Sequence, residues 1–391
     1  MARNYAKTKI MNFVKRNYMR LYGIFHKVEK KVLFISFSGK QYSDNPRAIS
    51  EKLHALYPAY EIVWAFNESA VLDDIPDYIK PVVKKGKFDF HFYRELATAF
   101  CYVTNYALGT DIWKRNGQFF IQTWHGDVGM KNVLYDAWRD GKRPMPVMDE
   151  KYTDLCISGS DLSEKKYHSA FRYFGEILKV GTPRNDKLMI PNVDEEKRTR
   201  TKLGIPERAK VLVFAPTFRD GVENAQDVIV DLHTALEILG ENGEEWVCLV
   251  RAHSASAGLN FACDGKRFVD ASGYPDLYDL LAISDMLITD YSSCAGDLIR
   301  CGKPVILALF DKEAYEAKHR ELYFDPEKAG FTVAHDQEEL NEILRTRTEA
   351  DDKEHCEKLM EYFGIVETGH ASEAVCNRIH AFYKGNYTNQ A

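Results

Sequence analysis

Four apolar stretches of the sequence end in side chains suited to phosphate chemistry. These endings are Ser292-Ser293, Trp124-His125-Gly126, Pro216-Thr217-Phe218-Arg219 and Arg251-Ala252-His253. Arginine forms a two-pronged contact with phosphate, hydroxyls donate hydrogen bonds, and imidazole moves protons near neutral pH. A helix that starts after the paired serines would add unpaired backbone N–H groups, which also bind anions. The sequence therefore predicts one cleft that holds a phosphorylated ligand.

The two histidines of these clusters are the candidate proton carriers. His125 leaves an apolar run directly before glycine, so it is predicted to accept the proton of an attacking hydroxyl, an effect of typically 10²–10⁴ in rate. A half-buried histidine with one structural hydrogen bond is the alternative. Arg251 would bind phosphate, and His253 would supply a second donor or a proton for the departing group.

Three further positions are candidate ligand contacts, each with a plainer alternative. The hydroxyl of Thr217 and its backbone suit a base or ribose, but turn chemistry explains them equally well. Arg184, in Gly181-Thr182-Pro183-Arg184-Asn185-Asp186, is placed either to close on a phosphate or to form an interdomain turn. Asp297 stands one helical turn after Ser293, so it would accept two ribose hydroxyls or simply complement the helix dipole.

Short apolar runs alternate with helical patterns along most of the chain, which indicates parallel sheets covered by helices on both faces. The predicted strands are Val32–Ser36, Ile62–Phe66, Cys101–Thr104, Phe119–Thr123, Leu155–Ser158, Ile177–Val180, Val211–Ala215, Trp246–Val250, Phe268–Asp270, Met286–Thr289 and Val305–Leu309. The clearest helical patterns are Asp231–Leu239, Pro275–Ile283, Glu338–Leu344 and Ser372–Tyr383.

The chain of 391 residues is long enough for two domains. A polar stretch without a predicted strand runs from Pro183 to Lys210, so we expect the N-terminal domain to span residues 32–185 and the C-terminal domain 186–391. Two facing doubly wound α/β domains place a ligand between them, at the carboxyl ends of their strands.

Residues 1–31 form a basic segment with nine Lys or Arg side chains and one acid, Glu29, although the whole chain has a net charge of −6. Aromatic and aliphatic residues are interleaved with these charges, and no run approaches the roughly 20 apolar residues that span a bilayer. The segment is predicted to form an amphipathic helix on an anionic membrane surface, at the cytoplasmic face. A solvated basic helix that also packs on the protein is the alternative.

Several other classes of protein are not supported by the sequence. It contains neither GxxxxGK[ST] nor a GxGxxG fingerprint after a strand. The eight cysteines include no CxxC pair, so neither a zinc site nor a disulfide framework is expected, and no carboxylate cluster calls for a metal. Basic and aromatic residues are interleaved only at the N-terminus, which argues against nucleic-acid binding. No tightly bound cofactor is expected; metal dependence and self-association stay open.

Six ordered motifs give the chain a resemblance to the CDP-glycerol glycerophosphotransferase family, which builds poly(glycerol phosphate) for teichoic acids and capsules. The motifs are Ser38-Gly39-Lys40-Gln41-Tyr42-Ser43-Asp44-Asn45-Pro46-Arg47-Ala48-Ile49, Trp124-His125-Gly126, Gly181-Thr182-Pro183-Arg184-Asn185-Asp186, Ala215-Pro216-Thr217-Phe218-Arg219-Asp220, Arg251-Ala252-His253, and Thr289-Asp290-Tyr291-Ser292-Ser293 with Asp297. The resemblance implies a GT-B-like pair of Rossmann-type domains, peripheral membrane attachment, and CDP-glycerol as donor.

The resemblance also implies roles for individual residues. His125 would be the base, and the loop from His125 to Gly129 would line the donor pyrophosphate site. The predicted donor contacts are His125, Gly126, Asp127, Val128, Gly129, Arg184, Pro216, Thr217, Arg251, Ala252, His253, Ser292, Ser293 and Asp297. The acceptor would be a lipid-linked saccharide or a growing polyol-phosphate chain, and the leaving group CMP.

Two departures from the family pattern leave the donor and acceptor open. Asp127 stands where threonine is common, and Ser254 where proline often follows the second histidine. An acid beside a pyrophosphate is unfavourable unless it points away from it. CDP-ribitol or a nucleotide sugar are alternative donors, and a catalytically silent scaffold on the membrane is the alternative from another class.

Overall fold

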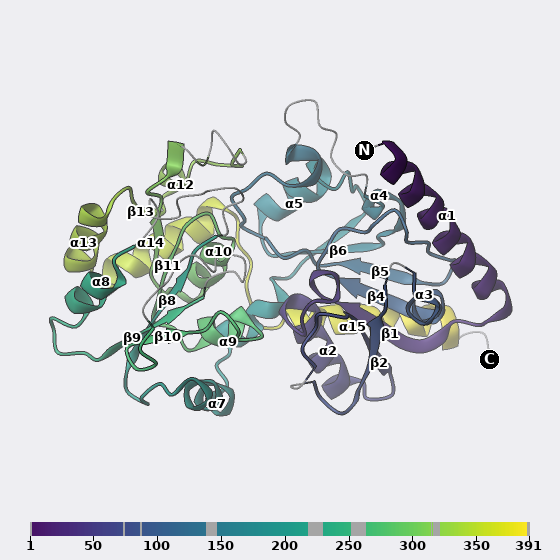
Figure 1. Cartoon of the computed structure of the whole chain (residues 1–391), viewed down its shortest axis with the longest axis horizontal. Helices are drawn as coiled ribbons and strands as arrows, with labels where there is room; N and C mark the ends of the chain where they lie inside the picture. The colour runs from purple at the N-terminus through teal and green to yellow at the C-terminus, as the bar shows by residue number, and fades with distance from the viewer. Residues whose placement is uncertain are drawn as a thin grey trace.

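The structure, a computed structural model, describes residues 2–72, 75–86, 88–137, 147–217, 230–251, 263–313, 315 and 321–388, with the backbone alone for residues 2–6. Two α/β domains lie side by side, each built on its own parallel sheet (Figure 1). Each sheet consists of buried, largely aliphatic and aromatic strands, as expected where helices cover both faces.

The first sheet has the strand order β3-β2-β1-β4-β5-β6-β7, with every neighbouring pair parallel. Its strands are β1 (Glu29–Ile35), β2 (Glu61–Asn67), β3 (Ile79–Lys84), β4 (Ala99–Thr104), β5 (Phe119–Gln122), β6 (Leu155–Ser158) and β7 (Glu176–Lys179). The helices associated with it are α1 (Ala2–Phe25), α2 (Asp44–Leu56), α3 (Phe90–Thr98), α4 (Asp149–Tyr152) and α5 (Asp161–Ser169). Helix α1 lies on the outer edge of this domain, against α3 (Figure 1).

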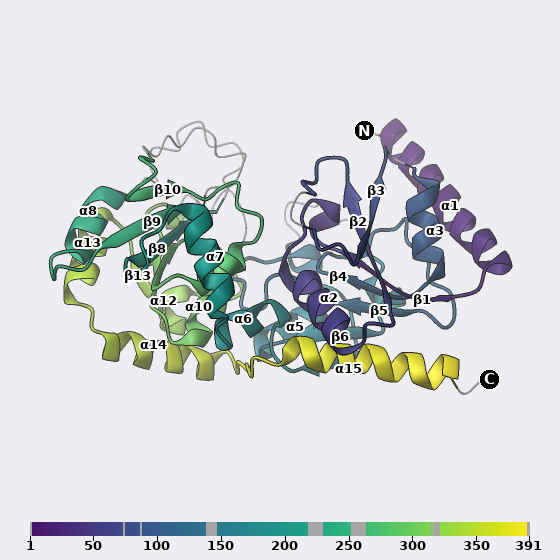
Figure 2. The same cartoon turned by 90° about the horizontal axis from the view of Figure 1, so that it is seen from below.

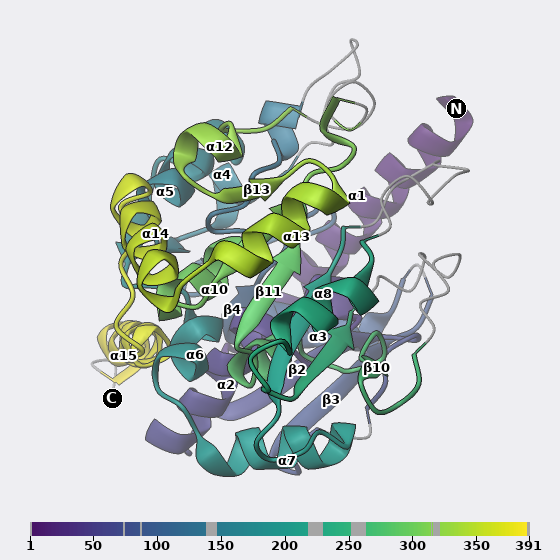
Figure 3. The same cartoon turned by 90° about the vertical axis from the view of Figure 1, so that its left-hand side faces the viewer.

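The second sheet has the order β10-β9-β8-β11-β12-β13, again entirely parallel. Its strands are β8 (Lys210–Ala215), β9 (Trp246–Val250), β10 (Phe268–Asp270), β11 (Met286–Thr289), β12 (Val305–Ala308) and β13 (Thr332–Ala334). Its helices include α8 (Leu232–Leu239), α9 (Leu277–Ala282), α10 (Cys294–Leu298), α12 (Pro326–Ala329), α13 (Gln337–Thr346) and α14 (Glu349–Tyr362). Helices α8 and α13 lie side by side on one face (Figure 3).

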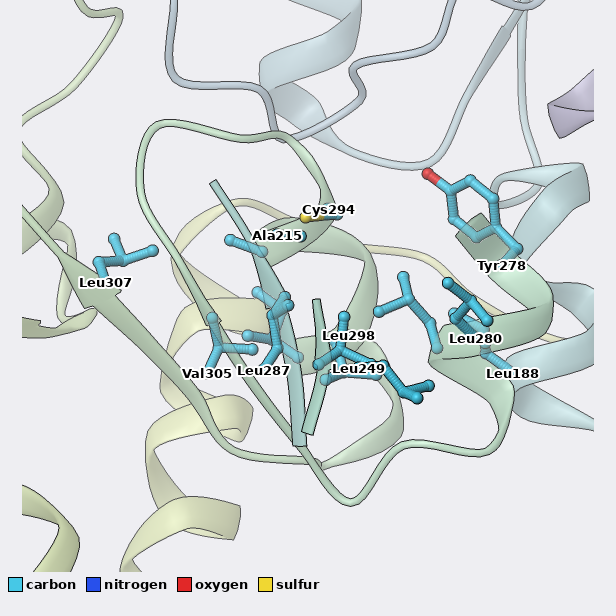
Figure 4. Close-up of a cluster of buried hydrophobic side chains, with 14 of the residues drawn as sticks. Leu188, Ala215, Leu249, Tyr278, Leu280, Leu287, Cys294, Leu298, Val305 and Leu307 are labelled. Carbon is cyan, nitrogen blue, oxygen red and sulfur yellow. The ribbon is translucent and has the colours of Figure 1, made fainter. Parts of the chain in front are cut away.

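Strand order reverses at the corresponding point of each sheet, next to β1 and β4 in the first and next to β8 and β11 in the second. Ligands of doubly wound folds bind outside the carboxyl ends of the strands at this reversal. A core of leucine, valine, alanine and tyrosine side chains holds the strands and helices beneath the second reversal in place (Figure 4). The fold class predicted from the sequence, two doubly wound α/β domains, is confirmed.

The stretch between the two sheets folds as short helices. It contains the 3-10 turn η3 (Pro183–Asn185), α6 (Asp186–Met189) and α7 (Val193–Leu203). The side chain of Asn192 caps the start of α7 by accepting the N–H of Glu195, and Gly204 ends the helix in the left-handed conformation, with φ 68°. These turns lead the chain from the first domain to the second.

The last helix, α15 (Ala371–Tyr383), returns to the first domain. It packs along α2, and Val375, Cys376 and Ile379 are buried in the core beneath the first sheet. Figure 2 shows α15 running beneath this domain, after α14 has crossed the second. A domain boundary at residue 186 therefore assigns α15 to the C-terminal domain, although this helix packs in the core of the first domain.

Candidate active site

A cavity of about 520 Å³ lies between the domains, at the carboxyl ends of both sheets. This volume falls in the usual range for small-molecule sites. We call it the reaction cavity. Eight of the residues predicted from the sequence line it, namely His125, Gly126, Gly129, Pro216, Thr217, Arg251, Ser292 and Ser293. The four strand endings singled out in the sequence thus contribute to one cavity wherever the structure describes them.

His125 follows β5 and is held by backbone groups of the first domain. Trp124 before it has φ 52°, a left-handed conformation rare outside glycine, and its carbonyl accepts a hydrogen bond from Asn45 Nδ2 at 2.9 Å. Nδ1 of His125 lies 2.6 Å from the carbonyl oxygen of Asn105, at the end of β4. Because a carbonyl only accepts, Nδ1 carries the proton and Nε2 keeps its lone pair.

The environment keeps the imidazole neutral at pH 7. Burial lowers the pKa of His125, and the hydrogen bond to Asn105 only partly offsets this effect. The ring also lies flat against Tyr106, with centroids 5.8 Å apart and planes 6° apart. A neutral, oriented imidazole with an acceptor nitrogen is the form that a general base requires.

The paired serines of the second domain lie directly beside His125. Ser293 Oγ donates to the carbonyl oxygen of His125 at 3.3 Å. Gly129 also lies close to Ser293, because a Cβ placed on it would be 3.4 Å from Cβ of Ser293. The hydrogen bond with Ser293 is made by the backbone of His125, and His125, Ser292 and Ser293 all line the reaction cavity. Helix α10 after the serines is only five residues long, so its dipole is small.

A buried lysine fixes the glycine-rich loop that follows His125. Lys166 on α5 donates through Nζ to the carbonyls of Gly126, Asp127 and Gly129, at 3.2, 3.0 and 2.6 Å. Burial lowers its pKa to about 7, although Asp127 acts in the opposite direction. Three carbonyls anchored by one side chain give the loop a single conformation at the edge of the cavity.

Asp127 points away from the reaction cavity. One carboxylate oxygen accepts the N–H of Gly159 at 2.9 Å, and the other pairs with the guanidinium of Arg300 in the second domain. Burial opposes ionisation, but Arg300 and the Gly159 N–H outweigh it and hold the pKa of Asp127 below its usual value. Arg300 also pairs with Glu367 at 3.1 Å. The acid that departs from the family pattern therefore joins the domains and does not line the reaction cavity, and its predicted contact with the donor stays a prediction.

Val128 and Gly296 form the closest contact between the loop and helix α10. Val128 is buried and packs in the core of the second domain. A Cβ placed on Gly296 would lie 2.4 Å from Cβ of Val128, closer than carbon atoms pack. The glycine therefore sets the distance at which α10 and the paired serines approach the loop.

Two contacts hold the second-domain wall of the cavity. Thr217 donates both its N–H and its hydroxyl to the carboxylate of Asp290, which follows β11. Arg251 donates through Nη1 to the carbonyls of Ala271 at 2.8 Å and Ser272 at 3.0 Å, and also to that of Tyr274. Burial lowers the pKa of Arg251. Arg251 thus shapes the loop that follows β10 and at the same time lines the cavity.

Arg184 and Asp297 do not line the cavity, because they pair with each other beneath it. Arg184 Nη2 lies 2.9 Å from Asp297, and its Nη1 lies 2.8 Å from Asp44 at the start of α2. The hydroxyl of Tyr278 donates to Asp297 at 2.7 Å. All four side chains are buried, and the pairs connect the two domains. The predicted contacts of Arg184 and Asp297 with the donor stay predictions.

Ala252 and His253 lie outside the residues that the structure describes, as does Ser254. Arg251, the described residue of that motif, lines the cavity. The predicted role of His253 at the leaving group is therefore carried by the sequence alone.

Sequence reasoning missed four residues that build the site, which are Asn105, Lys166, Asp290 and Gly296. Gly296 had a readable signal, because glycine inside the first turn of a helix often marks a close backbone approach. Asp290 lies two residues before Ser292 in the motif Thr289-Asp290-Tyr291-Ser292-Ser293, but no role was predicted for it. Asn105 and Lys166 act through contacts between segments distant in sequence, for which a single sequence carries no signal.

Among the described residues, no group of three or more His, Cys, Asp or Glu side chains is arranged to hold a metal ion. The helices in this part of the chain include none with the length and apolarity required to cross a membrane.

The paired parallel sheets and the cavity between them define a GT-B-like protein. The S. aureus MnaA–UDP structure shares this fold at 14% identity, with a TM-score of 0.53 over 92% of this chain and 98% of that one. Structures of the wall teichoic acid polymerase TagF are much more similar. One has a TM-score of 0.81 at 27% identity over 98% of each chain, and a variant soaked with CDPG has a TM-score of 0.79.

The sequence model of the CDP-Glycerol:Poly(glycerophosphate) glycerophosphotransferase family matches residues 18–381, and the chain belongs to this family. The teichoic acid poly(glycerol phosphate) polymerase of Bacillus subtilis is 33% identical over 90% of this chain but only 48% of its own length. The polymerase of the same name from Bacillus spizizenii is 28% identical over 95% of this chain and 99% of its own. The resemblance predicted from six motifs, and the enzyme class it implies, are confirmed.

Proposed function

We propose that this chain transfers glycerol phosphate from CDP-glycerol to a hydroxyl group of a teichoic acid acceptor. The acceptor oxygen attacks the β-phosphorus, a new phosphodiester forms, and the bond to the oxygen bridging the two phosphates breaks to release CMP. The observation that carries the proposal is that His125 of the first domain lines the same interdomain cavity as Arg251, Ser292 and Ser293 of the second. It supports a site where a base and phosphate-binding groups act on the same atoms.

His125 is the proposed base in this reaction. Its Nδ1 proton is engaged by Asn105, so Nε2 is the nitrogen that accepts the proton of the attacking hydroxyl. Arg251, Ser292 and Ser293 are proposed to stabilise the charge that develops on the phosphoryl oxygens. His253 is proposed to assist the departing CMP. Contacts of Arg184 and Asp297 with the donor would require their mutual ion pair to open on binding.

The proposed base is tested with His125→Gln. Transfer from radiolabelled CDP-glycerol should fall by about 10²–10⁴, while binding of CDP-glycerol, measured by calorimetry, stays intact. His91→Gln, at an exposed histidine of the same domain, is the matched control and should keep full activity. Full turnover in His125→Gln would remove the assignment.

The donor and the reaction are tested in the same assay. CDP-ribitol and nucleotide sugars are offered in parallel, and the nucleotide product is identified. Phosphoryl transfer releases CMP, whereas sugar transfer releases the nucleoside diphosphate. Release of a nucleoside diphosphate would contradict the proposal.

Peripheral attachment to the anionic, cytoplasmic surface of the membrane through α1 is the second part of the proposal. One face of α1 packs on the first domain through Lys15, Met19 and Gly23. The opposite face leaves five apolar side chains exposed at helical spacing, namely Ile10, Phe13, Val14, Leu21 and Ile24. An exposed apolar stripe on a basic helix fits an interfacial position at the lipid headgroups.

Membrane attachment is tested by co-sedimentation with vesicles that contain anionic lipid. The wild-type chain should bind them, and Phe13→Glu/Leu21→Glu should bind at least tenfold more weakly, because two charges replace exposed apolar groups on the stripe. The control Asn17→Glu adds one charge on the same helix without removing an apolar group. Equal binding by the wild-type and the doubly substituted chain would contradict the attachment.

A further inference from the structure

A second cavity, of about 570 Å³, opens between the domains beside the reaction cavity. The first domain contributes the segment that leads into α2 and the residues around Val71 and Pro76. The second domain contributes α7 and the loop that follows β10. Gln41 and Ser272 line both cavities, so the two spaces adjoin at these residues. We call the second space the side cavity.

The basic residues that line the side cavity differ in whether they form ion pairs with acidic side chains. Arg47 is engaged by Glu51, Asp276 and Asp279, and belongs to the wall. Lys40 and Arg198 are exposed and have no ion-pair partner among the described residues. These two cations come from different domains and line the same space. The lining also includes one acid, Glu195, and a further cation, Lys202, both on α7. The side cavity therefore presents cations from both domains to an anion.

The remaining lining combines hydroxyl groups with an apolar edge. Ser69 and Thr199 contribute hydroxyl groups, and Val71, Ile75 and Pro76 form the apolar part. A chain of phosphodiester-linked polyols carries one negative charge per unit, separated by carbon atoms and hydroxyl groups. Its phosphates suit the Lys and Arg side chains, and its polyol units suit the hydroxyl and apolar wall.

The proposed reaction places a geometric demand on such a chain. Only its terminal hydroxyl can lie beside His125, so the preceding units must leave the reaction cavity through an adjoining space. The side cavity is such a space, and Gln41 and Ser272 lie at the junction. Building on the proposed function, we propose that the side cavity binds the polyol-phosphate chain of the acceptor, with Lys40 and Arg198 as its phosphate contacts.

The test measures binding separately from transfer. A fluorescent oligo(glycerol phosphate) is titrated into the full chain, and CDP-glycerol binding is measured by calorimetry. Lys40→Glu/Arg198→Glu should weaken binding of the oligomer by about tenfold or more, since two favourable exposed contacts become repulsive. CDP-glycerol binding should be unchanged. The weakening should shrink as salt is raised from 50 to 500 mM, roughly as screening predicts.

Lys197→Glu is the matched control, because Lys197 is exposed on α7 next to Arg198 and does not line the side cavity. It changes the net charge in the same direction and should leave oligomer binding within about twofold of wild type. Equal losses of oligomer affinity in Lys197→Glu and in the single variant Arg198→Glu would overturn the proposal, because the change in net charge would then explain both losses. A loss confined to CDP-glycerol binding would overturn it as well, by assigning the side cavity to the donor.

Failure of the proposed function gives a different pattern. If the wild-type chain transfers no glycerol phosphate but binds the oligomer in a manner that depends on Lys40 and Arg198, the side-cavity proposal is supported and the proposed reaction is wrong. If transfer occurs and the oligomer binds equally to wild type and double variant, the reaction stands and the side-cavity proposal falls.

Discussion

The ion pairs around Arg300 connect the two domains behind the reaction cavity, and their loss is predicted to be strongly non-additive. Asp127 comes from the loop after His125, and Glu367 from the segment that leads to α15. Both carboxylates contact the guanidinium of Arg300, whose side chain is 0% exposed. The perturbation is a cycle of Asp127→Asn, Glu367→Gln and the double variant.

The magnitudes follow from the number of acids left beside Arg300 at pH 8. Either single variant keeps one carboxylate against the guanidinium and relieves the repulsion between the two acids, so it should cost no more than about 1.5 kcal/mol. The double variant leaves a buried guanidinium without its two acids, which should cost about 3–5 kcal/mol. The coupling between Asp127 and Glu367 should therefore exceed about 0.5 kcal/mol and reach 1–3 kcal/mol.

The assay is urea unfolding at pH 8, followed by tryptophan fluorescence, with matching slopes required across the four proteins. Adding Arg300→Met to the double variant removes the orphaned charge and should recover part of the lost stability. Two results would refute the reasoning. One is a double variant whose cost equals the sum of the single costs within about 0.5 kcal/mol. The other is a triple variant no more stable than the double.

Three further predictions concern single contacts around the site. Burial raises the pKa of Glu367 from 4.5 to about 7, so its contribution to the free energy of unfolding is full below about pH 4.5 and is lost as the pH rises through 7. Glu367→Gln should remove about 3 kcal/mol of the change in this free energy between pH 4.5 and pH 8. Lys166→Met frees the three loop carbonyls, so CDP-glycerol affinity should fall about tenfold, as for one lost charged hydrogen bond; unchanged calorimetric affinity would show that the loop needs no anchor. Gly296→Ala forces a Cβ against Cβ of Val128 and should lower stability by about 1–3 kcal/mol, whereas the same change in a Val128→Gly background, which lacks that Cβ, should cost less than about 1 kcal/mol.

The strand pattern of the sequence predicts most of the fold because each core strand is a short, buried apolar run. All eleven predicted strands are present; four have the predicted bounds, and the ends of the others differ by at most three residues. The two unpredicted strands, β3 and β13, lie at sheet edges. Pro81 lies inside β3, and proline is tolerated there because an edge strand has one unpaired side. β13 is three residues long and only Ala334 in it is buried, so it has little apolar pattern to recognise.

The candidate site was predictable where a residue follows a strand and much less where it acts across domains. His125, Thr217, Arg251, Ser292 and Ser293 line the reaction cavity, since strand ends meet at one edge of a parallel sheet. Whether a charged side chain faces a ligand or a buried partner depends on segments far apart in sequence, as for Asp127 and Arg300.

The return of α15 to the first domain has a consequence for synthesis of the chain on the ribosome. Val375, Cys376 and Ile379 complete the core under the first sheet, yet they are translated only after every strand of the second sheet. The first domain therefore emerges with a hydrophobic face that it cannot cover until α15 has also emerged. This protein therefore cannot fold vectorially, with the first domain complete before the second is translated. Its two halves must mature together, and a nascent chain stalled before codon 371 should depend on chaperones.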